Sequence, residues 1–285
     1  MRNKNIVYYM LIGFLVGISI LLYPAISNFW NSKRQTKAIV NYESVLEDLD
    51  EDDYTAVFDE AHAYNKALYN LRDPLVDFDA VKGYCDVLNV AGDEMIGYIE
   101  IDRIDVELPI YHGTSDSVLS RGVGHFQGSS LPVGGMNTHS ILTAHRGLPS
   151  SKLFTDLDRV EIGDTFEIIV LDQIFTYQVD QIKVIYPTEI GDLYISEGED
   201  YCTLITCTPY GINTHRLLVR GVRVETIKEK PRIYISNEAF RIDPLIVTPA
   251  VAAPMLFVLL IHLLVKYKEP PQGNNDEIGV KDDET

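Results

Sequence analysis

Two long uncharged runs, one near each end of the chain, constrain this sequence more than any other feature. Residues 6–26 contain no charged side chain, and residues 245–265 have His262 as their only ionisable side chain. As a helix, either run measures about 31 Å, enough to cross a bilayer core of about 30 Å. The core helix of a soluble protein is the alternative, but so long an uncharged run exceeds most core helices. We therefore predict two membrane spans, with both termini on one side and the residues between the spans on the other.

The first run also has the features of a secretory signal peptide. Arg2 and Lys4 give it a basic start, and Ala25-Ile26-Ser27 resembles a cleavage site. The apolar core of a signal peptide is usually about 7–15 residues long, so we expect this longer run to be retained. Basic residues also follow the run closely, at positions 33–37, so the charges alone do not orient it in a membrane.

Charge and cysteine content exclude several classes of function. The formal net charge of −18 argues against nucleic acid as a partner, because its phosphates require Lys and Arg. Residues 41–60 hold nine acidic side chains and no basic one, and residues 269–285 have the composition of a disordered acidic tail. Three cysteines (Cys85, Cys202 and Cys207) do not make a disulfide framework, and the odd count indicates a free thiol. No His/Cys cluster has metal-ligand spacing, so we predict neither a metal nor a cofactor.

The region after the first run has the three- and four-residue apolar spacing of amphipathic helices. This spacing holds over residues 39–49 and again over residues 54–71. We predict two helices packed as a hairpin, with a break near residues 50–53. Asp73-Pro74 is expected to end the second helix, because the residue before a proline avoids helical geometry.

From about residue 94 the apolar residues alternate with a period of two, which is typical of strands. Gly- and Pro-rich loops separate the apolar segments, and a short helix is expected at residues 152–158. Many strands with few helices predict a mainly β fold closed into an antiparallel barrel, which removes exposed strand edges. The expected strands cover residues 96–101, 106–111, 140–144, 166–171, 175–186, 201–207 and 216–224.

Three side chains at the ends of expected strands can do chemistry together: His145, Cys207 and Arg216. A cysteine reacts as the thiolate, which a nearby histidine can activate or stabilise as an ion pair. An arginine beside this pair can hold the oxyanion that forms when the thiolate attacks a carbonyl. From these residues alone, a structural thiol, a core histidine and a surface arginine remain the alternative.

The alternation of strand faces sorts the rival residues. Cys202 and Cys207 are five positions apart, so they face opposite sides of the strand, and Cys202 is expected to pack in the interior. His139 and His145 lie about 20 Å apart along one strand, too far to hold one metal ion. His215 remains a rival base, although its side chain is expected on the face opposite to that of the arginine beside it.

Four segments together resemble the sortase family. Thr203-Leu-Ile-Thr-Cys207 resembles the TLxTC motif of sortases, and Leu142-Thr-Ala-His-Arg-Gly147 resembles the sortase histidine segment. The segments Gly128-Ser-Ser-Leu-Pro-Val-Gly-Gly135 and Cys207-Thr-Pro-Tyr-Gly-Ile-Asn-Thr-His-Arg-Leu-Leu-Val-Arg-Gly221 are similar to the class C, pilin-polymerising subgroup. The resemblance spans roughly residues 40–225 in order and spacing.

The resemblance implies a closed eight-stranded β-barrel that catalyses transpeptidation on the surface of Gram-positive bacteria. In the implied reaction, Cys207 attacks the Thr–Gly carbonyl of an LPXTG-like sorting signal and forms a thioester. His145 is the implied proton donor to the leaving fragment, and Arg216 steadies the substrate or the oxyanion. An acceptor lysine of the next pilin subunit then resolves the thioester, so that pilins with such sorting signals polymerise. The implied enzyme is a peptidase-like cysteine transpeptidase without a cofactor.

Class C sortases carry a lid near their N-terminal helices, written Asp-Pro followed by an aromatic residue. The matching residues here are Asp73, Pro74 and Leu75. The resemblance implies that the aspartate is drawn to Arg216 and that the third residue covers the cysteine. Leu75 lacks a ring, and Phe78 is a candidate to replace it. An Asp-Pro that merely ends a helix is the alternative.

The catalytic barrel is thus expected between two membrane spans, on the extracellular face of the cell membrane. Two other functions stay open: a sortase that anchors surface proteins to peptidoglycan, and a pilus scaffold or adhesin without chemistry. The predicted segments are a membrane span (1–27), a helical hairpin with the lid (28–79), the catalytic barrel (80–230), a linker (231–244), a second membrane span (245–265) and an acidic tail (266–285).

Overall fold

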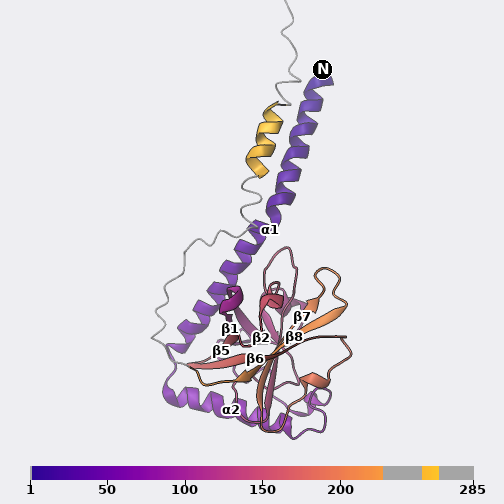
Figure 1. Cartoon of the computed structure of the whole chain (residues 1–285). Helices are drawn as coiled ribbons and strands as arrows, with labels where there is room; N and C mark the ends of the chain where they lie inside the picture. Colours follow the sequence, from indigo (N-terminus) through magenta and orange to yellow (C-terminus); the bar gives the residue numbers. More distant parts are fainter. Residues whose placement is uncertain (1, 227–251, 263–285) are drawn as a thin grey trace, which may run out of the picture. The chain divides into compact units, whose positions relative to one another are not determined.

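The computed structural model of the chain describes residues 2–226 and 252–262, and a β-barrel dominates it (Figure 1). Among these residues, eight strands close into one barrel in the order β1-β2-β3-β4-β7-β8-β6-β5, with β5 paired back to β1. This confirms the predicted closed, mainly β fold with short helices. The strands are β1 (Met95–Ile101), β2 (Val106–His112), β3 (Val123–His125), β4 (Thr138–Thr143), β5 (Thr165–Val170), β6 (Gln173–Ile185), β7 (Asp200–Thr208) and β8 (His215–Arg223).

The barrel is mixed rather than antiparallel throughout. β2 pairs with β3 in parallel, and β4 pairs with β7 in parallel. The expected all-antiparallel barrel is therefore wrong, because a period of two reports the faces of a strand and not the direction of its neighbour. The three-residue strand β3 has no counterpart among the expected strands and follows the short helix α3 (Asp116–Leu119). The parallel pairing of β4 and β7 places their carboxyl ends at the same edge of the barrel.

Two long helices precede the barrel. α1 (Arg2–Leu46) runs without interruption through residue 27, where the sequence suggested a boundary. α2 (Glu51–Tyr69) begins at the N-cap Asp50, which forms a capping box with Asp53. α2 ends before Asp73-Pro74, with Asn70 as its C-cap, so this dipeptide does not itself terminate the helix.

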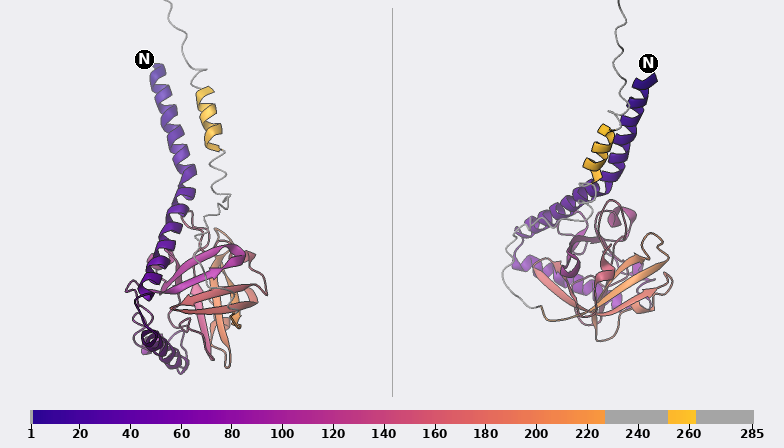
Figure 2. Two further views of the ribbon diagram at one scale, coloured as in Figure 1. Left: turned by 90° about the vertical axis from the view of Figure 1, so that its left-hand side faces the viewer. Right: turned by 45° about the horizontal axis from the view of Figure 1, so that its top comes forward.

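The apolar faces of both helices pack on the barrel, and the Tyr54 hydroxyl of α2 donates to the Leu46 carbonyl of α1 over 2.7 Å. Ile39 and Tyr42 of α1 join a buried cluster with Tyr98 and Ile169 of the strands. The Tyr42 hydroxyl donates to the Ile96 carbonyl of β1 and accepts a bond from the Leu171 N–H just after β5. It thus bridges two backbone groups that do not bond to each other directly. Apolar residues of α2 join the main barrel core, and the two views of Figure 2 show α2 beside the barrel.

The described residues include four short 3-10 helices, which are single turns between the longer elements. One of them, η3, overlaps the last two residues of the region where a short helix was expected, 152–158, and ends one residue beyond it. The 3-10 helices are η1 (Phe78–Ala80), η2 (Asp102–Ile104), η3 (Leu157–Arg159) and η4 (Gly191–Leu193).

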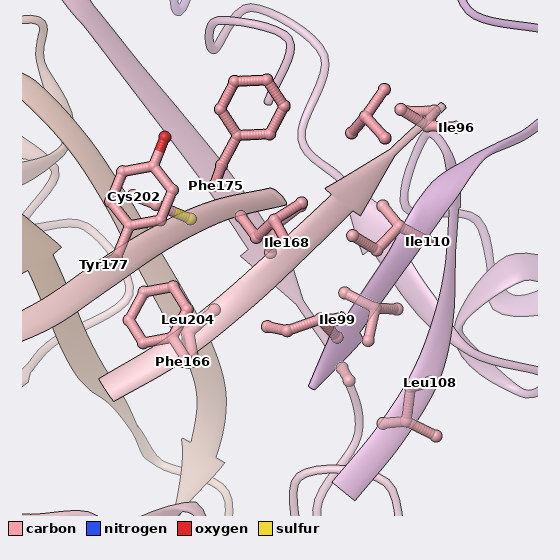
Figure 3. Close-up of a cluster of buried hydrophobic side chains, with 14 of the residues drawn as sticks. Ile96, Ile99, Leu108, Ile110, Phe166, Ile168, Phe175, Tyr177, Cys202 and Leu204 are labelled. Atoms are coloured by element: carbon pink, nitrogen blue, oxygen red, sulfur yellow. The ribbon is translucent and has the colours of Figure 1, made fainter. Parts of the chain in front are cut away.

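The interior of the barrel is filled by one cluster of buried apolar side chains from its strands and from α2. Figure 3 shows Cys202 and Leu204 of β7 in this cluster, together with Phe166, Ile168 and Tyr177. The Phe166 and Tyr177 rings stack with centroids 5.6 Å apart. These contacts hold the inner face of β7 fixed, which leaves its other face free to carry a site.

One helix among the described residues is long and apolar enough to cross a membrane, and it lies within Leu11–Leu46 of α1. A signal sequence near the N-terminus passes the same test. The described part of the second predicted span is the helix Ala252–His262, which alone is shorter than a span requires. The rest of that prediction, together with the linker at 231–244 and the tail at 266–285, lies outside the described residues.

Candidate active site

Cys207 and Arg216 lie opposite each other on neighbouring antiparallel strands. A short loop over residues 209–214 joins β7 to β8, and the register pairs Cys207 with Arg216. Directly opposed residues share one face of a sheet, with Cβ atoms about 4.5–5.5 Å apart. The strand pairing therefore brings the thiol and the guanidinium to one place.

His145 lies just beyond the carboxyl end of β4, the strand on the other side of β7. The parallel register of β4 and β7 pairs residues that are 62 positions apart, from Thr138 with Asp200 to Thr143 with Ile205. The same offset continues past the ladder, because the Thr206 hydroxyl donates to the Ala144 carbonyl over 2.8 Å.

One residue further along, Arg146 Nη1 donates to Thr208 Oγ1 over 3.3 Å, again at an offset of 62. His145 and Cys207 are thus enclosed by two bonds in the same register. If this register is extended, His145 comes opposite Cys207, at the spacing of about 4.8 Å between neighbouring strands.

Cys207 and Arg216 share the outer face of the barrel wall. Cys202, Leu204 and Val219 are fully buried in the interior cluster. Strand alternation then turns Cys207 and Arg216 to the opposite face, and both are half-buried. The prediction that the two cysteines of β7 face opposite sides is confirmed by their burial.

Arg216 is held by the loop that precedes it. Its Nη1 donates to the carbonyls of Asn213 and His215 over 3.2 and 3.0 Å. Within the described residues these bonds use Nη1 alone, so Nε and Nη2 are left to donate to a bound group. An anchored guanidinium with unused donors is suited to holding a developing negative charge.

The rival histidines have other partners. The His215 ring lies 4.5 Å from the Tyr186 ring, and its Nδ1 meets the Thr214 hydroxyl. His139 is buried, with Nδ1 3.0 Å from the Tyr194 carbonyl and Nε2 2.7 Å from the Thr203 hydroxyl. Burial lowers the pKa of His139. Both imidazoles are therefore committed to structural contacts.

The loops after β4 and β7 meet above the site. Gly147 has a φ of +76°, and a Cβ at this position would lie 2.8 Å from the Tyr210 ring. Only glycine combines this backbone conformation with so close an approach. No group of three or more His, Cys, Asp or Glu side chains that could hold a metal ion occurs within residues 2–226 and 252–262.

Comparison with known proteins identifies the family of this chain. A family model described as "Sortase domain" matches residues 99–224, which include His145, Cys207 and Arg216. Sortase C1 from Streptococcus agalactiae is 45% identical over 67% of this chain and 100% of that chain, with a TM-score of 0.62. The chain belongs to the sortase family.

Two further relatives show the range of this sortase family. A sortase C from Clostridium perfringens, solved with the C-terminal cell wall sorting motif, is 43% identical over 67% of this chain and 100% of its own, with a TM-score of 0.59. Sortase D of Bacillus subtilis is 29% identical over 45% of this chain. This chain covers 63% of that relative's length, which is less than two thirds. The structural neighbours are thus class C sortases.

The Asp73-Pro74-Leu75 segment packs beside the loop after β3 in this sortase. The Asp73 carbonyl accepts the N–H groups of Val76 and Asp77, which closes a tight turn. Pro74 is buried, and a Cβ on Gly128 would lie 2.8 Å from the Pro74 carbonyl. The segment is therefore ordered against the barrel and is more than the end of α2.

The partner of the Asp73 carboxylate is Tyr194 and not Arg216. The Tyr194 hydroxyl donates to the carboxylate at 3.2 and 3.3 Å from its two oxygens. Among the described ion pairs, none joins Asp73 to Arg216, so the expected attraction between them is absent from this conformation. Tyr194 follows η4, and its carbonyl is the one held by His139.

The contacts of two residues near this site, Tyr194 and Arg146, are not indicated by the sequence. Tyr194 lies between Leu193 and Ile195 in a segment that no motif marks, so nothing in the sequence indicates that it contacts Asp73. Arg146 is different, because it lies inside the histidine segment and next to His145. That position is the only signal, since its partners Asp158 and Thr208 become visible only in the fold.

Proposed function

We propose that this sortase is a cysteine transpeptidase of the class C type, which joins pilin subunits through a lysine amine. The single observation that carries the proposal is the continuous strand register around Cys207. It pairs Cys207 with Arg216 of β8, and the 62-residue offset between β4 and β7, which the side-chain bonds on either side keep, supports a position of His145 opposite Cys207. The similarity to class C sortases supports the pilin as the substrate.

The proposed mechanism is acyl transfer in two steps. The Cys207 thiolate attacks the Thr–Gly carbonyl of an LPXTG-like sorting signal, and the Arg216 guanidinium holds the oxyanion. His145 protonates the leaving glycine amine, and a thioester remains on Cys207. A pilin lysine amine then attacks the thioester and loses a proton to the His145 imidazole, the sulfur leaves as the thiolate, and an isopeptide bond forms.

The half-buried position of the site favours an amine over water as the acceptor. A thioester keeps the free energy of an acyl donor, and shielding from bulk water limits its hydrolysis. The Tyr210 side chain, 60% exposed above Gly147, and the 67% exposed Ile212 extend an apolar rim beside Cys207. This rim gives an incoming protein segment an apolar surface to contact.

The segment of Asp73, Pro74 and Leu75 is proposed as the lid of this site. Its packing against Gly128 and the bond from Tyr194 to Asp73 support an ordered, closed position. Leu75 is half-buried and supplies apolar cover without a ring. A closed lid would shield the free Cys207 thiol from reagents between turnovers, and it would have to open to admit the sorting signal.

The barrel is proposed to lie outside the cell membrane, anchored by the apolar part of α1 and by a second span over residues 245–265. The helix within Leu11–Leu46 has the length and composition of a membrane anchor, which supports the first part. The described helix Ala252–His262 supports the second part by its apolar composition.

The experiment that tests the function traps the acyl-enzyme. The full-length protein in detergent micelles is incubated with candidate sorting peptides, and mass spectrometry locates the added mass. We expect a thioester on Cys207 that disappears on addition of a pilin. Modification of another residue, or none with any sorting peptide, contradicts the mechanism.

A second measurement separates the pilin polymerase from its alternatives. Incubation with a pilin is expected to give a ladder of covalent oligomers. Transfer only to a peptidoglycan amine indicates a sortase that anchors surface proteins. A Cys207→Ala variant that still supports pilus assembly indicates a scaffold or adhesin.

A further inference from the structure

Arg146 is unusual among the ion-paired arginines of the described residues. Its side chain is 10% exposed, against 19% for Arg220 and between 45% and 72% for Arg103, Arg121 and Arg159. Its Nη2 lies 2.5 Å from Asp158 Oδ2, and its Nη1 donates to Thr208 Oγ1 over 3.3 Å. The guanidinium thus has one partner after β4, in η3, and another at the end of β7.

These two bonds lie where the backbone ladder has ended. The last described backbone bond between the strands joins the Ala144 N–H to the Ile205 carbonyl. Beyond it, the spacing of β4 and β7 is held by side chains, namely the Thr206 hydroxyl on the near side and Arg146 on the far side. His145 and Cys207 lie between these two side-chain contacts.

The 154–158 segment supplies a rigid support for this arrangement. Phe154 and Leu157 are fully buried, and the Phe154 N–H donates to the His145 carbonyl over 3.2 Å. The Asp158 carboxylate holds the next residue, Arg146, through its side chain. The same buried segment therefore fixes both the backbone of His145 and the guanidinium beside it.

The burial of Arg146 also has an unfavourable contribution to the free energy of folding. Its Nε is buried, and it has no hydrogen-bond partner among the described residues. A buried donor without an acceptor loses its hydration without compensation. Only a planar guanidinium can reach two acceptors in this fixed geometry, and a lysine ammonium cannot reproduce it.

We propose that Arg146 is a positioning residue, which joins Thr208 to Asp158 and thereby fixes the distance between the His145 imidazole and the Cys207 sulfur. The proposal rests on the proposed function of Cys207 and His145. Arg146 does not touch the substrate in this scheme. It acts through the two residues that it holds in register.

The test compares Arg146→Gln with Arg220→Gln in the full-length protein. Arg220 makes a bidentate pair with Asp180, at 3.0 and 2.6 Å, and its side chain is 19% exposed, so it is a matched ion pair without a bond to the strand ends. For Arg146→Gln we expect kcat of peptide transfer to fall about 100-fold with KM within about twofold, because small misplacements of reacting groups have effects of this size. Arg220→Gln is expected to leave both constants within about twofold.

A second variant keeps the test valid if Arg146→Gln folds poorly. Thr208→Val preserves the shape and removes only the acceptor on β7, and we expect a loss in kcat of about tenfold. Arg146→Lys is expected to recover little of the lost kcat, because one ammonium cannot bind both partners. Unchanged kcat in Thr208→Val and in folded Arg146→Gln, or an equal loss in Arg220→Gln, overturns the proposal.

A substrate-free readout separates this proposal from the proposed function. Alkylation of Cys207 by iodoacetamide is followed by mass spectrometry, with Cys85 as an exposed internal control. The positioning role predicts a shifted pH midpoint for Cys207 alkylation in Arg146→Gln, and no shift in Arg220→Gln. An unshifted midpoint contradicts the positioning role, whereas a wild-type protein that transfers no peptide contradicts the proposed function.

Discussion

The two faces of β7 put the same chemical group to different uses. On the inner face, Cys202 is fully buried beside Tyr177 and Leu204, and burial raises the pKa of its thiol. On the outer face, Cys207 is half-buried and lies opposite Arg216. A thiol in an apolar interior stays protonated and inert, whereas one beside cationic groups can react. Five positions along one strand therefore separate a packing residue from a proposed nucleophile.

The same contrast holds for the histidines. His125 of β3 is fully buried, and its ring contacts the Tyr84 hydroxyl at 2.9 Å and the Ser130 carbonyl at 2.8 Å. His145 is half-buried and lies just beyond the carboxyl end of β4. The barrel interior fixes side chains by burial, and its outer face leaves them able to exchange partners.

Replacing the two cysteines in turn tests whether Cys202 only packs and Cys207 reacts. Cys207→Ala is expected to lower peptide transfer by at least about 1,000-fold and to leave the melting temperature unchanged, because it removes the nucleophile from a half-buried site. Cys202→Ala is expected to keep most of the activity and to lower the free energy of unfolding by about 1 kcal/mol, since it removes a buried sulfur. Transfer assays and thermal melts of both variants decide the matter. Loss of activity in Cys202→Ala at full folding reverses the assignment.

Replacing Arg216 tests whether the outer face stabilises charge. Arg216→Ala is expected to lower kcat about 100-fold, the usual loss when one oxyanion donor is removed. Arg103→Ala removes an exposed surface arginine and serves as the control, with no expected change. Steady-state kinetics on a sorting peptide measures both, and equal kcat in the two variants rules out a role for Arg216 in the transition state.

The dependence of stability on pH tests whether the buried imidazoles are neutral in the folded protein. Burial lowers the pKa of His125 to about 3, whereas an unfolded histidine titrates near 6.5. Between these values the unfolded chain binds a proton that the native state does not. Stability is therefore fully present above pH 6.5 and falls by about 1.4 kcal/mol per pH unit as pH decreases toward 3.

The acid effect is measured as thermal unfolding of the full-length protein between pH 7 and pH 5. Burial also lowers the pKa of His112 and His139, which adds to the loss, whereas the raised pKa of Asp200 opposes it. A flat profile in the wild-type protein contradicts the buried, neutral state of these rings.

Opening of the proposed lid is expected to change the reactivity of Cys207 less than the substitutions above change activity. Asp73→Ala combined with Leu75→Ala is expected to speed alkylation of Cys207 about fivefold, the equivalent of one lost hydrogen bond of about 1 kcal/mol. Tyr194→Phe removes the same bond from the other side and is expected to act in the same direction. Mass spectrometry with the exposed Cys85 as internal reference gives the rates. Unchanged rates in both variants remove the lid from the mechanism.

Much of this fold follows from local patterns in the sequence. A period of two indicated seven of the strands to within one or two residues at most of their ends, because alternation reports which side of a strand is buried. The same alternation assigned Cys202 to the interior and Cys207 to the outer face. The uncharged run at residues 6–26 indicated a helix long enough for a membrane. Each of these inferences concerns neighbours along the chain.

The tertiary structure decided what depends on partners far apart in sequence. The parallel pairing of β4 with β7 joins residues 62 positions apart, and it directs the segment that carries His145 toward the end of β7 that carries Cys207. The bond from Tyr194 to Asp73 and the contacts of Arg146 likewise link distant segments. Hydrogen bonds between strands and loops select such partners by geometry, which no local period records. The sequence thus determined which residues are candidates for chemistry and which face of a strand they occupy, and the pairing of distant strands determined which of these candidates lie on neighbouring segments.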